Sequence, residues 1–269
     1  MIKPKKYFVF FIPILLSFLV LMSFNNLKKG EKETKRRSAS IEDEVKGAWR
    51  LVSTGVSDEA KMTVIKIITD VYYTYASYNE DDPEFIGTGG GTYDIDENNN
   101  FSENVEFFTW DSSRVGTTNF FEVKIEDGKM HHSGERDGEP FEEVWERVDG
   151  FDEEEAPLAG TWRIRQRQRE PGEMSTMEWG PRKTLKILSN KRIQWIAYNA
   201  ETGQFSGTGG GTYSSEDGKY IEKLEFFSRD PKRVGAELSF EFEKEGNNWH
   251  HRGKSSTGNE IYEVWEKVE

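Results

Sequence analysis

The sequence predicts an all-β protein: two tandem antiparallel up-and-down β-barrels of about eight strands each, preceded by an N-terminal hydrophobic helix. Three observations lead to this prediction. The heptapeptide GTGGGTY occurs at residues 87–93 and again at residues 207–213. The flanking sequence repeats as well, at a spacing of about 120 residues, which is too long for a solenoid and suits a duplicated domain. Each repeat consists of short segments rich in β-branched and aromatic residues, separated by turn-forming residues.

The repeat also sets the expected domain limits. Residues 44–149 should form the first barrel and residues 159–269 the second. Residues 150–158 are an acidic linker that contains Pro157, so it should stay extended and leave the barrels close but separately folded. In the first repeat we expect strands at residues 47–52, 61–69, 71–78, 85–95, 101–110, 115–125, 129–134 and 142–148. Closing such a meander into a barrel removes its exposed edges.

The composition excludes several classes of function. The 269 residues include no cysteine, so disulfides, cysteine metal sites, thiol catalysis and a lipid-modified cysteine anchor are excluded. Residues 1–37 carry nine Lys and Arg against two Glu, so with −13 for the whole chain the remainder has a net charge of −20. Because a region this acidic repels the phosphate backbone of nucleic acids, we expect no nucleic-acid partner.

The N-terminal residues predict a membrane-targeting segment. Three lysines precede an apolar run from Tyr7 to Phe24, so residues 1–26 are typical of a signal peptide or signal anchor. Residues 27–43 form a basic linker, which by the positive-inside rule would keep its side of the membrane in the cytoplasm. The β-rich body favours export instead. We expect a membrane-anchored protein with exported domains, or a secreted one if the segment is cleaved.

Each repeat opens on a Gly-x-Trp motif, Gly47-Ala48-Trp49 in the first and Gly160-Thr161-Trp162 in the second. The motif resembles the first-strand signature of lipocalin-like (calycin) barrels. In that family a basic residue of the last strand packs across the tryptophan, and Arg147 and Lys267 stand at the matching positions. The chain also resembles bacterial membrane-associated or secreted lipocalin-like proteins of undefined function. Residues 44–269 are covered, but the repeats are shorter than typical lipocalins and lack the C-terminal helix, which puts a large ligand cavity in doubt.

The repeated glycines predict a groove. Strand alternation places on one face Phe85, Gly87, Gly89, Gly91 and Tyr93. Either Trp49 or another large side chain fills this groove, or a ligand lies against the bare backbone. A phosphate-binding loop is not expected, because neither a Gly-Lys-Ser/Thr ending nor a helix signal follows the glycines.

All four histidines occur as pairs at matching positions of the repeats. His132 and His251 share a strand face with Met130 and Trp249, so we expect these two to point inward. They are either core or rim histidines or ligands of a haem or metal ion. One inward histidine per barrel is too few for a zinc site and a barrel of this size leaves little room for a porphyrin, so we predict no metal and no cofactor.

Arginines supply two further candidate contacts. Arg114 and Arg233 each follow a turn that holds an aspartate, and they either form a salt bridge that fixes the turn or contact an anion at the barrel mouth. Only the second repeat has arginines at every other position of its first strand. They should share the strand face opposite Trp162 and Ile164 and form an arginine stripe, whose members are Arg163, Arg165, Arg167 and Arg169. The stripe is either a solvated face or a contact for an anionic partner. Residues 170–181 should form a long loop, and the resemblance to lipocalin-like barrels implies that this first interstrand loop lies across the mouth.

The leading functional hypothesis is a non-catalytic, exported binding protein of the cell envelope. Its barrels would bind a small hydrophobic or amphipathic molecule, or an envelope protein. The residues expected at the two sites are Tyr75, Tyr93, Arg114, His132, Trp195, Tyr213, Arg233 and His251. One alternative is a structural or protein-interaction module with filled barrels. Another is a hydrolase, but the chain has no nucleophile elbow and no carboxylate pair stands out, although Glu106 and Glu225 lie between apolar neighbours at equivalent positions.

Overall fold

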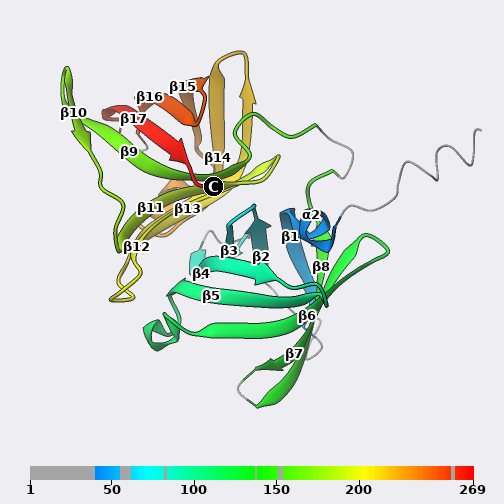
Figure 1. Cartoon of the computed structure of the whole chain (residues 1–269). Coiled ribbons are helices and arrows are strands. Elements are labelled where there is room, and N and C mark those ends of the chain that lie inside the picture. The colour runs from blue at the N-terminus through cyan, green and yellow to red at the C-terminus, as the bar shows by residue number, and fades with distance from the viewer. Residues whose placement is uncertain (1–39, 55–61, 82–83, 137, 151–153, 256–257) are drawn as a thin grey trace, which may run out of the picture. The chain divides into compact units, whose positions relative to one another are not determined.

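Two closed antiparallel meanders make up the described part of the chain (Figure 1). The computed structural model describes residues 40–54, 62–81, 84–136, 138–150, 154–255 and 258–269. The predicted N-terminal hydrophobic helix lies outside these ranges. Within them, no helix is both long and apolar enough to cross a bilayer. The prediction of an all-β fold with two eight-stranded barrels is confirmed.

The first barrel follows a five-residue helix, α2 (Ile41–Val45). Its strands, each paired with the next and the last paired with the first, are β1 (Gly47–Ser53), β2 (Thr63–Ile68), β3 (Tyr72–Asn79), β4 (Glu84–Ile95), β5 (Asn100–Phe108), β6 (Thr118–Glu126), β7 (Lys129–Arg136) and β8 (Glu139–Arg147).

The second barrel repeats this order with one addition. Its strands are β9 (Gly160–Glu170), β10 (Glu173–Thr176), β11 (Arg182–Leu188), β12 (Arg192–Asn199), β13 (Phe205–Glu216), β14 (Lys219–Phe227), β15 (Glu237–Glu245), β16 (Asn248–Lys254) and β17 (Glu260–Lys267). Pairing of β9 with β17 closes the barrel, while β10 pairs only with β9. Part of the segment predicted to be a loop is therefore a strand, which extends β9 into a long hairpin.

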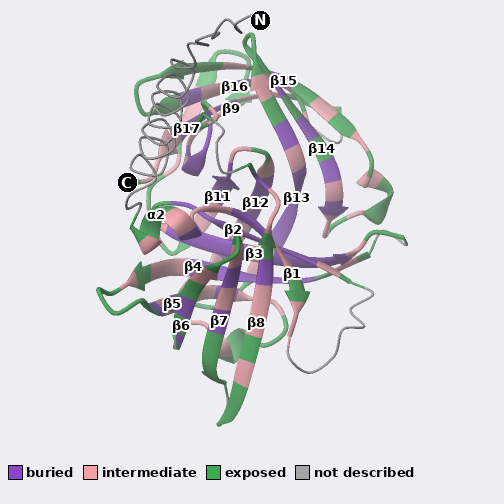
Figure 2. Cartoon of the chain, turned by 90° about the vertical axis from the view of Figure 1, so that its right-hand side faces the viewer, coloured by how far each residue is buried: buried purple, intermediate pink, exposed green. Residues whose placement is uncertain are grey.

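Alternation along the strands separates core from surface. In Figure 2 buried residues alternate with more exposed ones along β14, as expected where one face of a strand looks into a barrel. Each barrel has a core of its own at one end, and a tryptophan closes it. The indole of Trp49 donates to the carbonyl of Val45 at 2.7 Å, and that of Trp162 to the carbonyl of Leu158 at 2.9 Å. Both tryptophans are fully buried.

The basic residue expected over each tryptophan is present in both barrels, but from different strands. The guanidinium of Arg147 lies 4.1 Å from the ring centre of Trp49, which confirms the prediction for the first barrel. In the second barrel Lys267 pairs in register with Trp162 and packs beside Gly160, whereas the ammonium over the ring is that of Lys244, at 5.9 Å. The prediction that Lys267 packs across the ring of Trp162 was therefore wrong.

The glycine strands are bulged, and the bulges decide which way nearby side chains point. Opposite Gly90 and Gly91, strand β5 carries one extra residue, Glu106. A Cβ on Gly91 would collide with the backbone of Asn104, so only glycine allows the two strands to approach this closely. The bulge turns Glu106 away from the barrel interior. The same arrangement recurs around Gly211 and Glu225.

The glycine groove is filled by side chains. Tyr75 and Phe108 lie against Gly89, and Trp110 covers Gly87. Trp49 is not the residue that fills it. Phe85 was also wrongly placed on this face, because a bulge in the register between β3 and β4 makes it pair with Tyr78 and point to the outside of the barrel.

The barrels share a buried core, which corrects the prediction that they are separately folded. Its residues come from the outer faces of both; they include Ile65, Ile67, Tyr78, Phe107, Leu185, Ile187, Tyr198 and Phe226. Two equivalent tyrosines cross this core in opposite directions. The hydroxyl of Tyr78 donates to Glu225 at 2.6 Å, and that of Tyr198 donates to Glu106. These two glutamates, which the sequence left as a possible acid–base pair, thus anchor the barrel–barrel contact.

Candidate ligand-binding cup

The second barrel encloses a cavity of about 670 Å³ above its filled end, which we call the cup. It opens because β9 pairs with β11 only as far as Arg163 and then departs with β10. The apolar lining residues are Ile164, Met177, Trp179, Trp195, Ala197, Leu224, Phe227, Leu238, Phe240, Ile261 and Trp265. A cavity of this volume with a largely apolar lining lies within the size range of small-molecule sites.

A buried ion pair lies in the cup wall. The ammonium of Lys186 is 2.8 Å from Glu222, and both side chains are about 6% exposed. Tyr220 donates a hydrogen bond of 2.6 Å to the same carboxylate. Burial alone would raise the pKa of Glu222, but the charge of Lys186 and the hydrogen bonds outweigh it and hold this pKa below its usual value. Lys186 also lies 4.8 Å from the ring centres of Tyr220 and Trp249, so aromatic faces replace part of its lost hydration.

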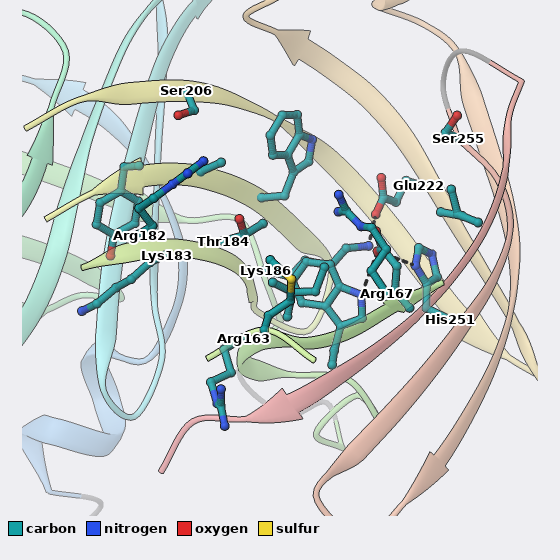
Figure 3. Close-up of a pocket in the computed structure, with 18 of the residues that line it drawn as sticks. Arg163, Arg167, Arg182, Lys183, Thr184, Lys186, Ser206, Glu222, His251 and Ser255 are labelled. Carbon is teal, nitrogen blue, oxygen red and sulfur yellow. Dashed lines mark hydrogen bonds and ion pairs between the residues drawn. The ribbon is translucent and has the colours of Figure 1, made fainter. Parts of the chain in front are cut away.

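A second polar group lies beside this pair (Figure 3). Arg167 donates to Glu263 at 2.9 Å, and Nδ1 of His251 lies 3.5 Å from the other oxygen of that carboxylate. Burial and the charge of Lys186 lower the pKa of His251 to about 4, against the opposing effect of Glu263. Burial would raise the pKa of Glu263, but His251 and Arg167 lower it to about 2. At neutral pH the cup wall therefore holds an ionised Glu263 and a neutral His251.

The arginine stripe does not lie on one face, and a β-bulge is the reason. In the pairing of β9 with β17, Ile164 faces Trp265 and Gln166 faces Val264, so Arg165 is the extra residue. Past the bulge the inward and outward positions exchange. Arg167 therefore points into the same interior as Trp162, whereas Arg163 lies on the other side of the strand, at the edge of the cup, and forms an ion pair with Glu266. Simple alternation could not show this exchange.

The first barrel has the same inner groups but less space. Its buried pair is Lys66 and Glu103, at 2.9 Å. Its counterpart of Glu263 is Glu143, which is bound by Arg136 of β7 at 2.9 Å. Ser255 occupies the position of Arg136 in the second repeat, and the arginine comes from β9 instead. A recess of about 470 Å³ remains on one side of the first barrel, along β5–β8.

The cup brings together two of the eight predicted site residues. Trp195 and His251 line it. Tyr213 lies in the filled end, where its hydroxyl donates to the carbonyl of Ser189 at 2.6 Å. Arg233 lies 3.7 Å from Asp230 and fixes the turn at the short 3₁₀ helix Pro231–Arg233, as one of the two interpretations anticipated.

The four residues predicted for the first barrel are spread over three environments. Tyr75 packs under Trp110, with ring centres 6.0 Å apart. Tyr93 donates to the carbonyl of Thr69 at 2.5 Å. His132 is fully buried against Phe121 and other core aromatics, and its pKa lies well below the usual value because of burial and Lys66. Arg114 lines the recess.

Sequence reasoning named Arg167 only as a member of the arginine stripe and missed four other polar groups of the cup, namely Lys186, Glu222, Arg229 and Glu263. The sequence does contain a signal for the buried lysine–glutamate pair. Lys66 and Lys186 interrupt apolar runs at equivalent positions, with an isoleucine directly after each. A lysine recurring inside a buried strand needs an interior partner, so Glu103 and Glu222 were predictable in kind, though not in place. In the described ranges no three His, Asp or Glu side chains are arranged to hold a metal ion.

The closed eight-stranded meanders, each with a Gly-x-Trp first strand and a cation over its tryptophan, define a tandem lipocalin-like protein. The chain belongs to the family described as a domain of unknown function, DUF4488, whose model matches residues 44–155 and again residues 157–269. No curated protein matches the chain.

Two solved structures are similar at low identity. A lipocalin-like protein from Bacteroides uniformis is 17% identical and aligns over 41% of this chain and 98% of its own, with a TM-score of 0.30. An uncharacterised protein from Saccharomyces cerevisiae is 16% identical and aligns over 82% of this chain and 97% of its own, with a TM-score of 0.47.

Proposed function

We propose that the protein is a non-catalytic binding protein and that the cup of the second barrel holds a small, partly apolar molecule. The observation that carries this proposal is the cavity itself, about 670 Å³ with Trp195, Phe240 and Trp265 in its wall. Closed barrels of this kind are a ligand-binding fold, because a rigid wall of strands encloses the interior. Removal of apolar ligand surface from water would supply most of the binding free energy.

The two barrels differ in a way that supports one binding barrel. Arg136 lies inside the mouth of the first barrel, where it contacts both Glu143 and the ring of Phe141. Its counterpart in the second barrel is the smaller Ser255, which lines the cup. We infer that the first barrel chiefly supports the second through their common core. An exported location at the cell envelope is part of the proposal and rests on the N-terminal segment of the sequence alone.

The neutral fluorophore N-phenyl-1-naphthylamine tests the binding function, because its emission rises in an apolar site. The full-length protein should bind one molecule per chain. Ser255→Arg, which introduces the side chain that the first barrel has, should abolish binding. Ser214→Arg adds the same side chain at an exposed position of β13 and should leave binding intact. Near-ultraviolet circular dichroism checks that each variant is folded.

The same titration distinguishes the alternatives. If neither the wild type nor the Ser214→Arg variant binds the fluorophore, the cup is not a binding site and the protein-interaction function takes its place. If Ser255→Arg binds as well as the wild type, the fluorophore lies outside the cup and the proposed site is wrong.

A further inference from the structure

The cup of this acidic protein is rich in cations. Its lining includes seven Lys and Arg but only three Glu, although the whole chain has a net charge of −13. The cations are Arg163, Arg167, Arg169, Arg182, Lys183, Lys186 and Arg229. An excess of one charge in a concave, poorly solvated site raises the local concentration of ligands of opposite charge.

Four of these cations are already neutralised by ion pairs. Their partners are Glu266 for Arg163, Glu263 for Arg167, Glu106 for Lys183 and Glu222 for Lys186. Among the described residues, Arg169, Arg182 and Arg229 have no carboxylate partner. The guanidinium of Arg229 donates to the carbonyl of Ser206, at 3.0 and 3.2 Å. The uncompensated positive charge therefore belongs to these three arginines, against one further carboxylate of the lining, Glu178, that is in none of these pairs.

The strand register places Arg182 and Arg229 at the same rim. Thr184, Ala197 and Gly207 form one row across β11, β12 and β13. The guanidinium of Arg229 lies over Gly207 at one end of this row. Arg182 is two residues beyond Thr184 on β11, so it faces the same side of the sheet, and Figure 3 shows it at the opposite end of the cavity from His251.

The first barrel lacks these rim charges. The residue equivalent to Arg229 is Trp110, which stacks on Tyr75 and covers the glycine groove. The residue equivalent to Arg182 is Met62, an exposed apolar side chain. Because the two repeats otherwise share their inner groups, the basic rim is a property of the second barrel rather than of the fold.

We propose that the ligand of the cup is an amphipathic organic anion, with its apolar body among the aromatic side chains and its acidic group at the rim beside Arg182 and Arg229. This inference rests on the proposed function and adds the class of ligand. The inner ion pairs leave no net charge deep in the cup, so the apolar body lies there. A guanidinium offers a planar fork of donors that suits the oxygens of a carboxylate, sulfonate or phosphate group.

A matched pair of fluorophores tests the ligand class. 8-Anilinonaphthalene-1-sulfonate differs from N-phenyl-1-naphthylamine by one sulfonate group. We expect the full-length protein to bind the sulfonate roughly tenfold more tightly than the neutral compound, the effect of about one charge-assisted hydrogen bond in a partly screened site. Raising the ionic strength should weaken only the sulfonate.

Substitutions then locate the anion. Arg182→Met with Arg229→Gln should remove the preference for the sulfonate, measured as the ratio of the two affinities within the same variant. Should the double variant fail to fold, each single substitution should reduce the preference. Lys223→Gln removes a charge from an exposed outward position of β14 and should change neither affinity.

The outcomes separate this inference from the proposed function. If the wild type binds both compounds equally, or the neutral one more tightly, the anionic class is wrong while the cup remains a binding site. A preference that survives in the double variant overturns the assignment of the rim arginines. Failure of the wild type to bind either compound overturns both proposals.

Discussion

Lys186 and Glu222 form an ion pair of 2.8 Å inside the second barrel, and the equivalent Lys66 and Glu103 do so inside the first at 2.9 Å. The lysines lie on the equivalent strands β2 and β11, and the glutamates lie on the equivalent strands β5 and β14. Each pair therefore links two strands across the barrel interior. Duplication has kept this link even though the two interiors now differ in the space above it.

Removing one member of the pair should be more harmful than removing both. Lys186→Met leaves Glu222 buried without its charge partner, and we expect a loss of about 3–5 kcal/mol in the free energy of unfolding. The double variant Lys186→Met with Glu222→Leu leaves no buried charge and should recover most of this loss. Urea unfolding of the wild type, both single variants (Lys186→Met and Glu222→Leu) and the double variant measures the coupling. A double variant as unstable as the sum of the two single variants would show that the pair is not energetically coupled.

The bulge glycines should tolerate no side chain. In Gly211→Ala the new Cβ would overlap the carbonyl of Lys223, and the backbone there also has a φ of +155°. We expect a loss of more than about 2 kcal/mol, by the strain mechanism that accounts for large effects of single substitutions. Gly180→Ala is the control, because among the described residues no heavy atom other than those of its chain neighbours lies within 4 Å of the new methyl group. Equal melting temperatures for the two variants would contradict this account of the bulge.

Protonation of His251 should lower the free energy of unfolding at pH values above those at which most carboxylates become protonated. The folded pKa of about 4 lies below the ordinary value of 6.5, so the unfolded state binds more protons between these values. Stability is complete above pH 6.5 and falls as the pH decreases towards 4, by about 3 kcal/mol for this group. Buried His132 acts in the same direction. Glu263, with a folded pKa of about 2, adds a further loss as the pH falls from its ordinary value near 4.5.

Replacing the histidine isolates its part of this profile. His251 faces Lys186, Glu222 and Glu263, and all three remain in His251→Asn. The free energy of unfolding of this variant should depend less on pH between 6.5 and 4 than that of the wild type. His250→Asn, on the outer side of the same strand, is the matched control and should keep the wild-type dependence. An unchanged slope in His251→Asn would show that another group dominates acid sensitivity.

The contact between the barrels should stabilise both of them. Tyr78→Phe leaves Glu225 with Arg192 but without the phenol hydroxyl, and Tyr198→Phe leaves Glu106 with Lys183. Each substitution should lower the free energy of unfolding by about 1.5–3 kcal/mol, the cost of one hydrogen bond to a charged group. Calorimetry should show a single transition for the wild type, because the barrels share a core. Two separate transitions in the wild type would contradict this coupling.

The sequence by itself determined the class of fold and its duplication. Strand lengths, turn residues and the repeated heptapeptide predict two barrels, because period-two alternation and turn chemistry are local properties of the chain. The resemblance carried by Gly-x-Trp also anticipated Arg147 over Trp49. The inward direction of His132 and His251 followed from alternation alone, and both are buried.

The tertiary structure decided everything that depends on register. Alternation placed Phe85 and the part of the arginine stripe beyond Arg165 on the wrong faces, because one extra residue in one strand reverses every position beyond it and the sequence does not mark that residue. Such bulges also turn Arg167 into the cup and Glu106 out of the first barrel. Which barrel has an open interior depends on how side chains of strands far apart in the sequence meet, as Arg167 of β9 does with Glu263 of β17. Space in a core is set by such long-range packing, so only the folded molecule shows that the second barrel contains the cup.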